Sequence, residues 1–252
     1  MHIAGKTILV TGGARRIGAE IVRKLASLGA NVAIHCNRSL DAAKALAAEI
    51  EHDFNVSAWV LQQDLAEEDA GEALFLATLD ATGGRLDVIV NSASEYAVKS
   101  AEEMTDEDLR RAKRIHVDSA TALIQCIAGL PGDSSKAVVN ILDARIDRGD
   151  DPMHAPYMLA KRWLAESSRV LALEFAPRVR VNCVAPGAVL QADNETPADI
   201  ECFAKFNPMN AIGTPAEVAE CVVFLLSMDF ICGQTLFYDG GYHLRPYPPL
   251  EP

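Results

Sequence analysis

The 252-residue chain lacks any apolar run that approaches the roughly 18 residues needed to cross a bilayer. It also lacks a signal peptide pattern, because the apolar stretch in its first residues, MHIAGKTILVTGG, is short and runs directly into glycines. We therefore expect a cytoplasmic protein that does not act at a membrane.

Paired cysteine motifs and an excess of basic residues are absent as well. The six cysteines are scattered, with no CxxC motif and no histidine spacing suited to zinc, so we expect reduced thiols and no metal site. The chain has 23 Lys and Arg against 35 Asp and Glu, a formal net charge of -12. This charge disfavours nonspecific binding to nucleic acid or to anionic membranes.

The overall composition is typical of a globular protein. Half of the residues are hydrophobic and 23% are charged, which argues against a disordered or fibrous chain. No linker, internal repeat or low-complexity segment divides the sequence. We therefore expect a single domain over residues 1–252, long enough to bury a substantial core.

Short β-branched runs alternate with longer amphipathic stretches along the whole chain. The strand-like runs cover residues 7–10, 32–35, 57–61, 87–90, 137–142, 179–184 and 235–238. The helical patterns cover residues 17–28, 40–51, 65–81, 106–129, 155–176 and 215–227. This alternation predicts an α/β fold in which a doubly wound, parallel seven-stranded sheet has helices on both faces.

Two segments break the alternation. Residues 188–213 are rich in Asn and Pro, and we expect a long loop with a short helix that contributes to substrate binding. The tail RPYPPLEP, residues 245–252, contains four prolines and cannot form a helix. It either frays or packs against a neighbouring subunit.

The first predicted strand ends in a glycine-rich turn, TGGARRIG, over residues 11–18. Glycines at such a turn let the backbone approach a pyrophosphate, which the free N–H groups of the following helix attract. The turn therefore predicts a dinucleotide site, and an ordinary strand-to-helix turn is the alternative.

The corner after the second predicted strand indicates which dinucleotide is bound. It reads HCNRS over residues 35–39, with no acidic residue to bind a ribose 2′-hydroxyl before Asp41. A guanidinium beside a hydroxyl suits a 2′-phosphate instead. We therefore expect NADP(H) rather than NAD(H).

Tyr157 and Lys161 lie four residues apart in a helical pattern, so they share one helix face. A tyrosine is a poor acid–base catalyst at its ordinary pKa near 10. A neighbouring ammonium favours the phenolate, and we expect Lys161 to draw the pKa of Tyr157 toward neutrality. The pair is suited to passing a proton to a carbonyl or imine during hydride transfer. A surface tyrosine beside a solvated lysine is the alternative.

These features, together with two later segments, resemble the short-chain dehydrogenase/reductase family. The family's TGxxxGxG turn corresponds to residues 11–18, with Arg16 at the middle glycine, and its YxxxK motif to Tyr157 and Lys161. Its N-x-V-x-P-G segment corresponds to residues 182–187 and its G-Q…DGG ending to residues 233–241. The resemblance covers essentially the whole chain and implies a Rossmann-like fold and a homotetramer.

The resemblance also assigns residues to the cofactor. It places Asp64 beside the adenine and the segment 91–93 under the cofactor backbone, although either could instead cap the next helix. The segment that follows the sixth strand would hold the nicotinamide. The expected cofactor contacts are Gly12, Arg15, Arg16, Ile17, His35, Asn37, Arg38, Ser39, Asp64, Leu65, Asn91, Ser92, Ala93, Lys161, Pro186, Gly187 and Val189.

One position departs from most of the family. A serine usually follows the fifth strand, but here the segment NILDA, residues 140–144, carries Asp143. A carboxylate near the tyrosine can share in proton donation or bind an amino-bearing substrate, whereas a hydroxyl can only form hydrogen bonds. A solvated or helix-capping Asp143 is the alternative.

Arg16, the HCNRS corner and Asp143 together resemble the pteridine reductases, including the bacterial dihydromonapterin reductases, which use NADPH. This resemblance implies that Arg16 contacts both a cofactor phosphate and the pterin, and that Asp143 and Tyr157 flank the reduced ring position. In the pteridine reductases the position of Tyr96 is usually a phenylalanine that stacks on the pterin, and the resemblance implies that Tyr96 stacks in the same way. An ordinary aromatic on the rim of the site is the alternative. The resemblance also implies that Ser94 bonds the pterin or a phosphate. The expected catalytic residues are Asp143, Tyr157 and Lys161, and the expected substrate contacts are Arg16, Ser94, Tyr96, Asp143 and Tyr157.

Two further features bear on the reaction and the substrate. The resemblance matches Asp118 to an asparagine that, in most of the family, fixes a helix kink and a water in the proton relay. An ionised aspartate accepts the same bonds but cannot donate. The acidic residues in the 188–213 loop suit a small pterin better than a polyglutamated folate; they are Asp193, Glu195, Asp199 and Glu201.

The sequence therefore predicts an NADPH-dependent reductase that transfers hydride to dihydrobiopterin, dihydromonapterin or dihydrofolate. An alternative with the same fold and cofactor is a carbonyl reductase, for example of a 3-oxoacyl thioester, a sugar or a steroid. A third hypothesis is a sensor or scaffold that binds NADP without turnover.

Overall fold

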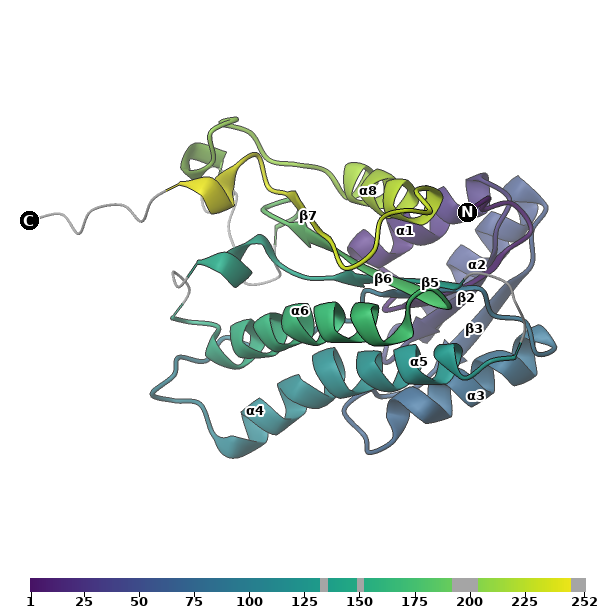
Figure 1. Cartoon of the computed structure of the whole chain (residues 1–252), viewed down its shortest axis with the longest axis horizontal. Coiled ribbons are helices and arrows are strands. Elements are labelled where there is room, and N and C mark those ends of the chain that lie inside the picture. The colour runs from purple at the N-terminus through teal and green to yellow at the C-terminus, as the bar shows by residue number, and fades with distance from the viewer. Residues whose placement is uncertain (132–135, 149–151, 192–203, 246–252) are drawn as a thin grey trace, which may run out of the picture.

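Seven parallel strands form one sheet in the order β3-β2-β1-β4-β5-β6-β7 (Figure 1). This computed structural model describes residues 1–131, 136–148, 152–191 and 204–245. The strands are β1 (Thr7–Thr11), β2 (Asn31–Cys36), β3 (Ala58–Gln62), β4 (Val88–Asn91), β5 (Lys136–Ile141), β6 (Val179–Pro186) and β7 (Thr235–Tyr238). The predicted fold class is confirmed.

The central strands are apolar on both faces because helices cover the sheet on both sides. Every residue of β1 and of β4 is buried. Ile8 of β1 pairs with Val32 of β2 on one side and with Val88 of β4 on the other. Continuous apolar runs of this kind are typical of parallel strands that are buried on both faces.

Two groups of helices pack on opposite faces of the sheet (Figure 1). The first group is α1 (Arg16–Ser27), α2 (Leu40–Phe54) and α8 (Pro215–Ser227). The second is α3 (Ala70–Thr82), α4 (Asp106–Lys113), α5 (Ser119–Ala128) and α6 (Ala155–Phe175). The two groups bury separate apolar clusters against the strands.

Two predicted helices differ from the structure. The helix expected over 65–81 begins only at Ala70, because Asp64 Oδ1 accepts the N–H of Ala66 and Asp69 adopts a left-handed φ of 55°. The helix expected over 106–129 is interrupted by a π-helical turn, η1 (Arg114–Asp118). Such a turn changes which side chains face the protein interior.

Other sequence expectations lie outside the described residues. These are most of the loop at 188–213, of which residues 192–203 are not described, and the tail from residue 246 onward. Within the described ranges, the cysteines form no disulfide, and no helix is long and apolar enough to cross a membrane.

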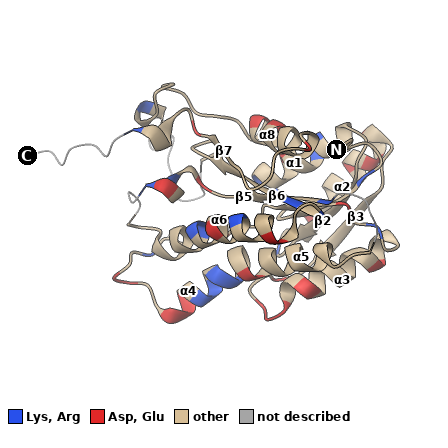
Figure 2. Cartoon of the chain, viewed as in Figure 1, with Lys and Arg blue, Asp and Glu red and all other residues tan. Residues whose placement is uncertain are grey.

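Charged residues are spread over the outer helices (Figure 2). On α4 they are ordered along the axis: the first turn is acidic and the last turn is basic. This order complements the helix dipole. Thr105 caps the helix through a reciprocal pair of hydrogen bonds with Asp108.

The strand order reverses between β1 and β4, which are neighbours in the sheet. In open parallel sheets, ligands bind at the carboxyl ends of the strands beside such a reversal. The segments that follow β1, β4, β5 and β6 therefore meet at one edge of the sheet, where the site lies.

Candidate active site

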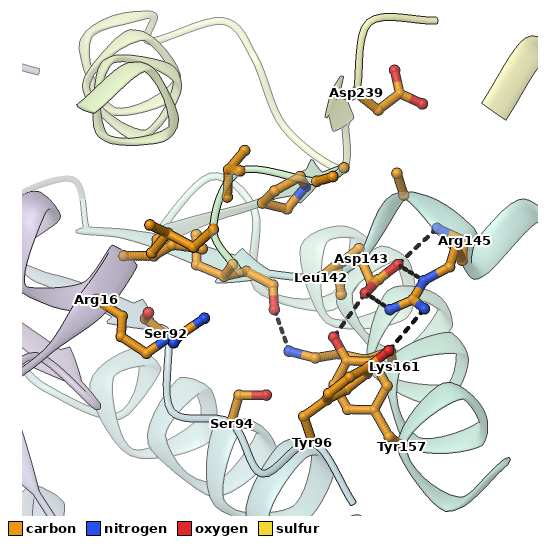
Figure 3. Close-up of a pocket in the computed structure, with 18 of the residues that line it drawn as sticks. Arg16, Ser92, Ser94, Tyr96, Leu142, Asp143, Arg145, Tyr157, Lys161 and Asp239 are labelled. Carbon is orange, nitrogen blue, oxygen red and sulfur yellow. Dashed lines mark hydrogen bonds and ion pairs between the residues drawn. The ribbon is translucent and has the colours of Figure 1, made fainter. Parts of the chain in front are cut away.

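A cavity of about 520 Å³ opens at the carboxyl ends of the strands (Figure 3). The β1–α1 turn, the loops after β4, β5 and β6, and the first turns of α6 line it. The predicted site residues that line it are Gly12, Arg15, Arg16, Ile17, Ser92, Ser94, Tyr96, Asp143, Tyr157, Lys161, Pro186, Gly187 and Val189.

A second cavity of about 250 Å³ continues from the glycine turn to the end of β2. It is lined by the remaining predicted cofactor residues except one: His35, Asn37, Arg38, Ser39, Asp64, Leu65 and Ala93. Two guanidinium groups, of Arg15 and Arg38, and the Ser39 hydroxyl supply donors for a phosphate. The donor set therefore fits a phosphorylated ribose at this corner.

Asn91 is the exception, since it lines neither cavity. Its side chain is buried between two strands, where Nδ2 donates to Asn140 Oδ1 over 2.8 Å. Asn91 thus holds β4 to β5. The neighbouring loop residues, Ser92 and Ala93, instead donate their N–H groups to Thr11 Oγ1.

The glycine turn is shaped by close backbone contacts. Gly12 has a φ of +63°, and a Cβ atom there would lie 2.7 Å from Ala93 Cα. At Gly18, a Cβ atom would lie 2.2 Å from the Gly12 carbonyl oxygen. Both positions require glycine because a Cβ atom would clash with the neighbouring backbone.

His35 supports this turn from inside the sheet. Its Nδ1 accepts the Gly12 N–H over 3.1 Å, and Nε2 lies 3.0 Å from the carbonyl oxygen of Gln63. Burial lowers the pKa of His35 to about 4, so the ring is neutral and can accept at Nδ1 and donate at Nε2. We therefore assign His35 to holding the phosphate loop.

Arg16 takes the left-handed backbone conformation that a glycine usually provides, with a φ of 56°. Its guanidinium donates to the carbonyl oxygen of Gln191 over 2.8 Å. Arg16 therefore links the phosphate turn to the start of the loop after β6, beside the cavity (Figure 3).

Asp143 and Tyr157 are directly bonded. The Tyr157 hydroxyl donates to Asp143 Oδ2 over 2.9 Å, and Tyr157 is only 7% exposed. Asp143 also caps a 3-10 turn, η2 (Ala144–Asp147), by accepting the N–H of Arg145 over 2.9 Å. Asp143 therefore caps the turn, as the alternative for this residue held, and the same side chain also lies against Tyr157.

Arg145 is a site residue that sequence reasoning missed. Its guanidinium binds both oxygens of Asp143, with Nε to Oδ1 at 2.9 Å and Nη2 to Oδ2 at 2.8 Å. Nη1 donates to the Tyr96 hydroxyl over 3.0 Å. Burial raises the pKa of Asp143, but the bonds and charge of Arg145 outweigh burial and leave this pKa below its ordinary value.

Lys161 lies beneath Tyr157 on α6. Its Nζ donates to the carbonyl oxygen of Ile141 over 2.6 Å and lies 5.6 Å from the centre of the Tyr157 ring. Burial lowers the pKa of Lys161 to about 8.

The expectation that Lys161 draws the pKa of Tyr157 toward neutrality is wrong. Burial, and then the charge of Asp143, raise the pKa of Tyr157 well above 10. Burial in the protein and a carboxylate facing the hydroxyl both disfavour the phenolate.

The expectation for Asp118 is also wrong. Asp118 is exposed and pairs with Lys113 on the outer side of η1. His116, on the same π turn, is instead buried, with its ring centre 5.5 Å from that of Tyr157. The π turn therefore presents His116 to the site.

His116 is neutral in this position. Burial, together with the charge of Lys161, lowers its pKa to about 3. Nε2 lies 3.3 Å from the Glu95 carbonyl oxygen, and Nδ1 is buried with no partner among the described residues.

Other residues of the large cavity were not predicted from the sequence. Asn207, Asp239 and Tyr242 also line it. Asp239 lies well away from the Asp143 cluster (Figure 3). It belongs to the DGG segment at residues 239–241, and nothing in the sequence alone places it at the cavity.

Comparison with known proteins gives full-length matches. A family model described as enoyl-(acyl carrier protein) reductase matches residues 12–243. The crystal structure of FolM alternative dihydrofolate reductase 1 from Brucella canis, complexed with NADP, is 35% identical with a TM-score of 0.92. That match covers 99% of this chain and 98% of that chain.

Two sequence relatives are of similar length. The uncharacterized oxidoreductase YmfI of Bacillus subtilis is 31% identical over 244 residues, which cover 94% of this chain and 99% of YmfI. The 3beta-hydroxysteroid dehydrogenase 1 of Eggerthella lenta is 29% identical over 257 residues, which cover 97% and 96% of the two chains. With the Tyr157–Lys161 pair at the sheet edge, these matches show that the chain belongs to the short-chain dehydrogenase/reductase family of oxidoreductases.

Proposed function

We propose that this protein is an NADPH-dependent reductase that converts a dihydropterin to the tetrahydropterin. The ring C=N bond takes up a hydride at carbon and a proton at nitrogen. The Asp143 carboxylate, held beside Tyr157, is the observation that carries this proposal.

The donor set of the second cavity supports NADP(H) as the cofactor. Arg15, Arg38 and Ser39 surround the corner where a ribose 2′-phosphate would lie, and charge-assisted bonds favour a phosphate there. The Brucella canis relative is complexed with NADP, which supports the same choice. When bound, the nicotinamide supplies the hydride.

Asp143 favours a substrate with N–H groups over an ordinary ketone. A serine at this position would donate a hydrogen bond to a carbonyl oxygen, but a carboxylate only accepts and repels such an oxygen. A dihydropterin carries N–H groups on the same ring system as its C=N bond, and these can donate to Asp143. The ionised state of Asp143 follows from its bonds to Arg145.

Tyr157 is suited to act as the proton donor. Its raised pKa keeps the hydroxyl protonated throughout the physiological pH range. A higher pKa also makes the hydroxyl a weaker acid, so Tyr157 holds the proton that reduction needs but releases it less readily while its bond to Asp143 persists. After the proton is transferred, the Lys161 ammonium stabilises the phenolate across 5.6 Å from the ring centre.

Tyr96 supplies a flat wall for the substrate. Its ring lines the cavity and meets the Tyr157 ring edge-on at a centroid distance of 4.9 Å. A planar heterocycle can stack on an aromatic face of this kind. Arg16 and Ser94 line the same cavity, which supports a role for both in bonding the ring edge or a cofactor phosphate.

NADPH oxidation by the purified protein tests the proposal. The substrates are dihydrobiopterin, dihydromonapterin, dihydrofolate and an acetoacetyl thioester. We expect turnover of at least one pterin, and a roughly 10²- to 10⁴-fold loss of kcat/KM on this pterin in Asp143→Ser. Asp147→Ser, an exposed change in the same 3-10 turn, is the matched control and should retain activity.

Two results would contradict the proposal. Turnover of the thioester alone would identify a carbonyl reductase, the activity class suggested by the name of the Eggerthella lenta relative. Tight NADPH binding without turnover of any substrate would identify a sensor.

We also propose that the protein assembles as a homotetramer. Exposed apolar side chains follow α6, a face that a second copy would cover: Leu159, Trp163, Val170 and Leu173. Light scattering of the purified protein gives the mass of the assembly, and Val170→Asp should lower it. An unchanged mass in this variant, or a wild-type monomer, would contradict the assignment of this face.

A further inference from the structure

Arg145 occupies the wall of the cavity, and the proposed chemistry does not use it directly. Its side chain is 19% exposed and that of Asp143 is 14% exposed, so their ion pair is largely shielded from water. The guanidinium is also bonded to the Tyr96 hydroxyl and lies 5.4 Å from the centre of the Tyr96 ring (Figure 3). Arg145 therefore connects the proton-donating pair to the aromatic wall.

The Asp143 carboxylate has no acceptor site left for another donor. Oδ1 accepts the backbone N–H and the Nε–H of Arg145. Oδ2 accepts from Arg145 Nη2 and from the Tyr157 hydroxyl. A carboxylate has about four lone-pair sites, and all four are filled.

An incoming donor must therefore replace one of these bonds. Arg145 is attached through three N–H groups, one of them in the backbone of η2, whereas Tyr157 is attached through a single hydroxyl. The Tyr157 bond is the easiest to exchange. Until it is exchanged, the Tyr157 proton is directed at Asp143 and not at the substrate.

We propose that Arg145 is a positioning residue that keeps Asp143 ionised and fixed, so that Tyr157 releases its proton only when a substrate N–H takes over Oδ2. This inference rests on the proposed function for the identity of the substrate ring. A dihydropterin carries N–H donors on the ring system that contains the reduced C=N bond. A ketone brings none, so Tyr157 remains bonded to Asp143 and ketones are rejected.

The proton balance of this exchange is simple. The substrate N–H forms a hydrogen bond to Oδ2 and keeps its proton. Tyr157 then turns its O–H toward the nitrogen of the C=N bond and transfers that proton as the carbon receives the hydride. Tyr157 recovers a proton from solvent after the product leaves.

The charged and titratable groups that face Asp143 come from three segments. Arg145 belongs to η2, Tyr157 and Lys161 to α6, and Tyr96 to the loop after β4. Arg145 makes the hydrogen bonds that offset the burial of the carboxylate. Without Arg145, a carboxyl in this buried position would hold its proton to higher pH.

The test compares Arg145→Met with Arg169→Met, a control in which an exposed arginine of α6 is changed in the same way. Aspartate carboxyl carbons are labelled with ¹³C, and the Asp143 signal is assigned by its loss in Asp143→Asn. The chemical shift is followed from about pH 5 to 8. We expect no titration of Asp143 in the wild type or in Arg169→Met, and titration within this range in Arg145→Met.

Steady-state kinetics supply the second readout. In Arg145→Met we expect kcat/KM for the dihydropterin to fall roughly 10- to 100-fold at pH 7, with a new loss of activity toward acid pH. Reduction of a ketone should rise as pH falls, because a protonated Asp143 offers a hydroxyl donor as serine does. The wild type should show neither trend.

A folded Arg145→Met variant with the wild-type pH profile and no Asp143 titration would overturn the inference. If Arg145→Met does not fold, titration of Asp143 between pH 5 and 8 in the wild type is by itself enough to overturn the inference. Efficient ketone turnover by the wild type would also contradict it. Absence of turnover on every substrate would count only against the proposed function, because the carboxyl titration would still decide the role of Arg145.

Discussion

The ring of Tyr96 stacks on the imidazole of His154, with the ring centres 3.8 Å apart and the planes inclined by 12°. The Tyr96 hydroxyl lies 3.1 Å from His154 Nδ1 and also accepts from Arg145. Tyr96 thus joins the loop after β4 to the residue that precedes α6 and to η2. A phenylalanine, the residue that the pteridine reductases usually have here, could keep the stacking but not these bonds.

Replacing Tyr96 by phenylalanine should therefore weaken the site without removing its flat wall. We expect kcat/KM on the proposed dihydropterin to fall by about tenfold, the effect of losing one to two hydrogen bonds of ordinary strength. Tyr96→Ala should cost considerably more because it removes the stacking surface as well.

Tyr238→Phe is the matched control. Its hydroxyl bonds Glu217 outside both cavities, so its loss should leave kcat/KM unchanged. Equal kinetics for Tyr96→Phe and the wild type would show that the bonds of the Tyr96 hydroxyl do not position the ring.

The lowered pKa of Lys161 predicts how the activity changes at alkaline pH. Its pKa is lowered to about 8, mainly by burial, so the ammonium is lost as the pH rises through this value. A neutral amine cannot stabilise the Tyr157 phenolate that forms in reduction. We expect kcat/KM to fall above about pH 8, whereas Tyr157, with its pKa well above 10, does not titrate there.

Lys161→Arg separates this effect from general alkaline inactivation, because a guanidinium stays charged in proteins. Whatever activity the variant retains should show no fall near pH 8. Lys44→Met, a change at an exposed position of α2, should keep the wild-type profile. If kcat/KM of Lys161→Arg falls near pH 8 as in the wild type, a group other than Lys161 causes the fall.

Most cavity residues were predicted from the sequence because their motifs immediately follow apolar strands. The carboxyl ends of parallel strands meet at one edge, so strand order suffices to gather Gly12, Ser94 and Asp143. Arg145 was missed because it lies in a 3-10 turn, where no hydrophobic periodicity indicates which way a side chain points.

The error at Asp118 has a different physical origin. A single π turn, which the sequence pattern does not reveal, changes the facing of residues 114–118 and buries His116 instead. The pKa of Tyr157 was mispredicted because it depends on burial and on which charged group its hydroxyl contacts. Motif spacing shows that Lys161 is near, but not that Asp143 is nearer.

Arg16 predicts a trade-off between stability and activity. Its φ of 56° costs a non-glycine residue roughly 1 kcal/mol. Arg16→Gly should therefore maintain or raise the free energy of unfolding, by up to about 1 kcal/mol, and remove the guanidinium from the cavity. We expect a higher KM for NADPH and for the substrate.

Asp69→Gly provides the comparison, because Asp69 has nearly the same φ, 55°, and lies outside both cavities. Urea unfolding should give a small or no gain for this variant, since aspartate tolerates the left-handed region better than arginine. Its KM values should not change. Unaltered KM values in Arg16→Gly would remove Arg16 from the binding site.

Two buried histidines predict that the fold loses stability in mild acid. The pKa of His35 is lowered to about 4, and that of His116 to about 3, in each case chiefly by burial. In the unfolded chain both titrate near 6.5. Between these values the unfolded state binds protons that the folded state excludes, so the free energy of unfolding falls as the pH falls.

From pH 7 to pH 5, each histidine should lower the free energy of unfolding by about 2 kcal/mol. Urea denaturation at the two pH values measures the loss. In His35→Gln and in His116→Gln, the loss of unfolding free energy between pH 7 and pH 5 should be smaller than in the wild type by about 2 kcal/mol, the contribution of one histidine. This holds even where the variant is less stable than the wild type at pH 7. His52→Gln, with a side chain 88% exposed, should leave it unchanged. If both buried variants lose as much stability as the wild type between pH 7 and 5, the acid sensitivity arises elsewhere, and the neutral state of His116 beneath Tyr157 needs another explanation.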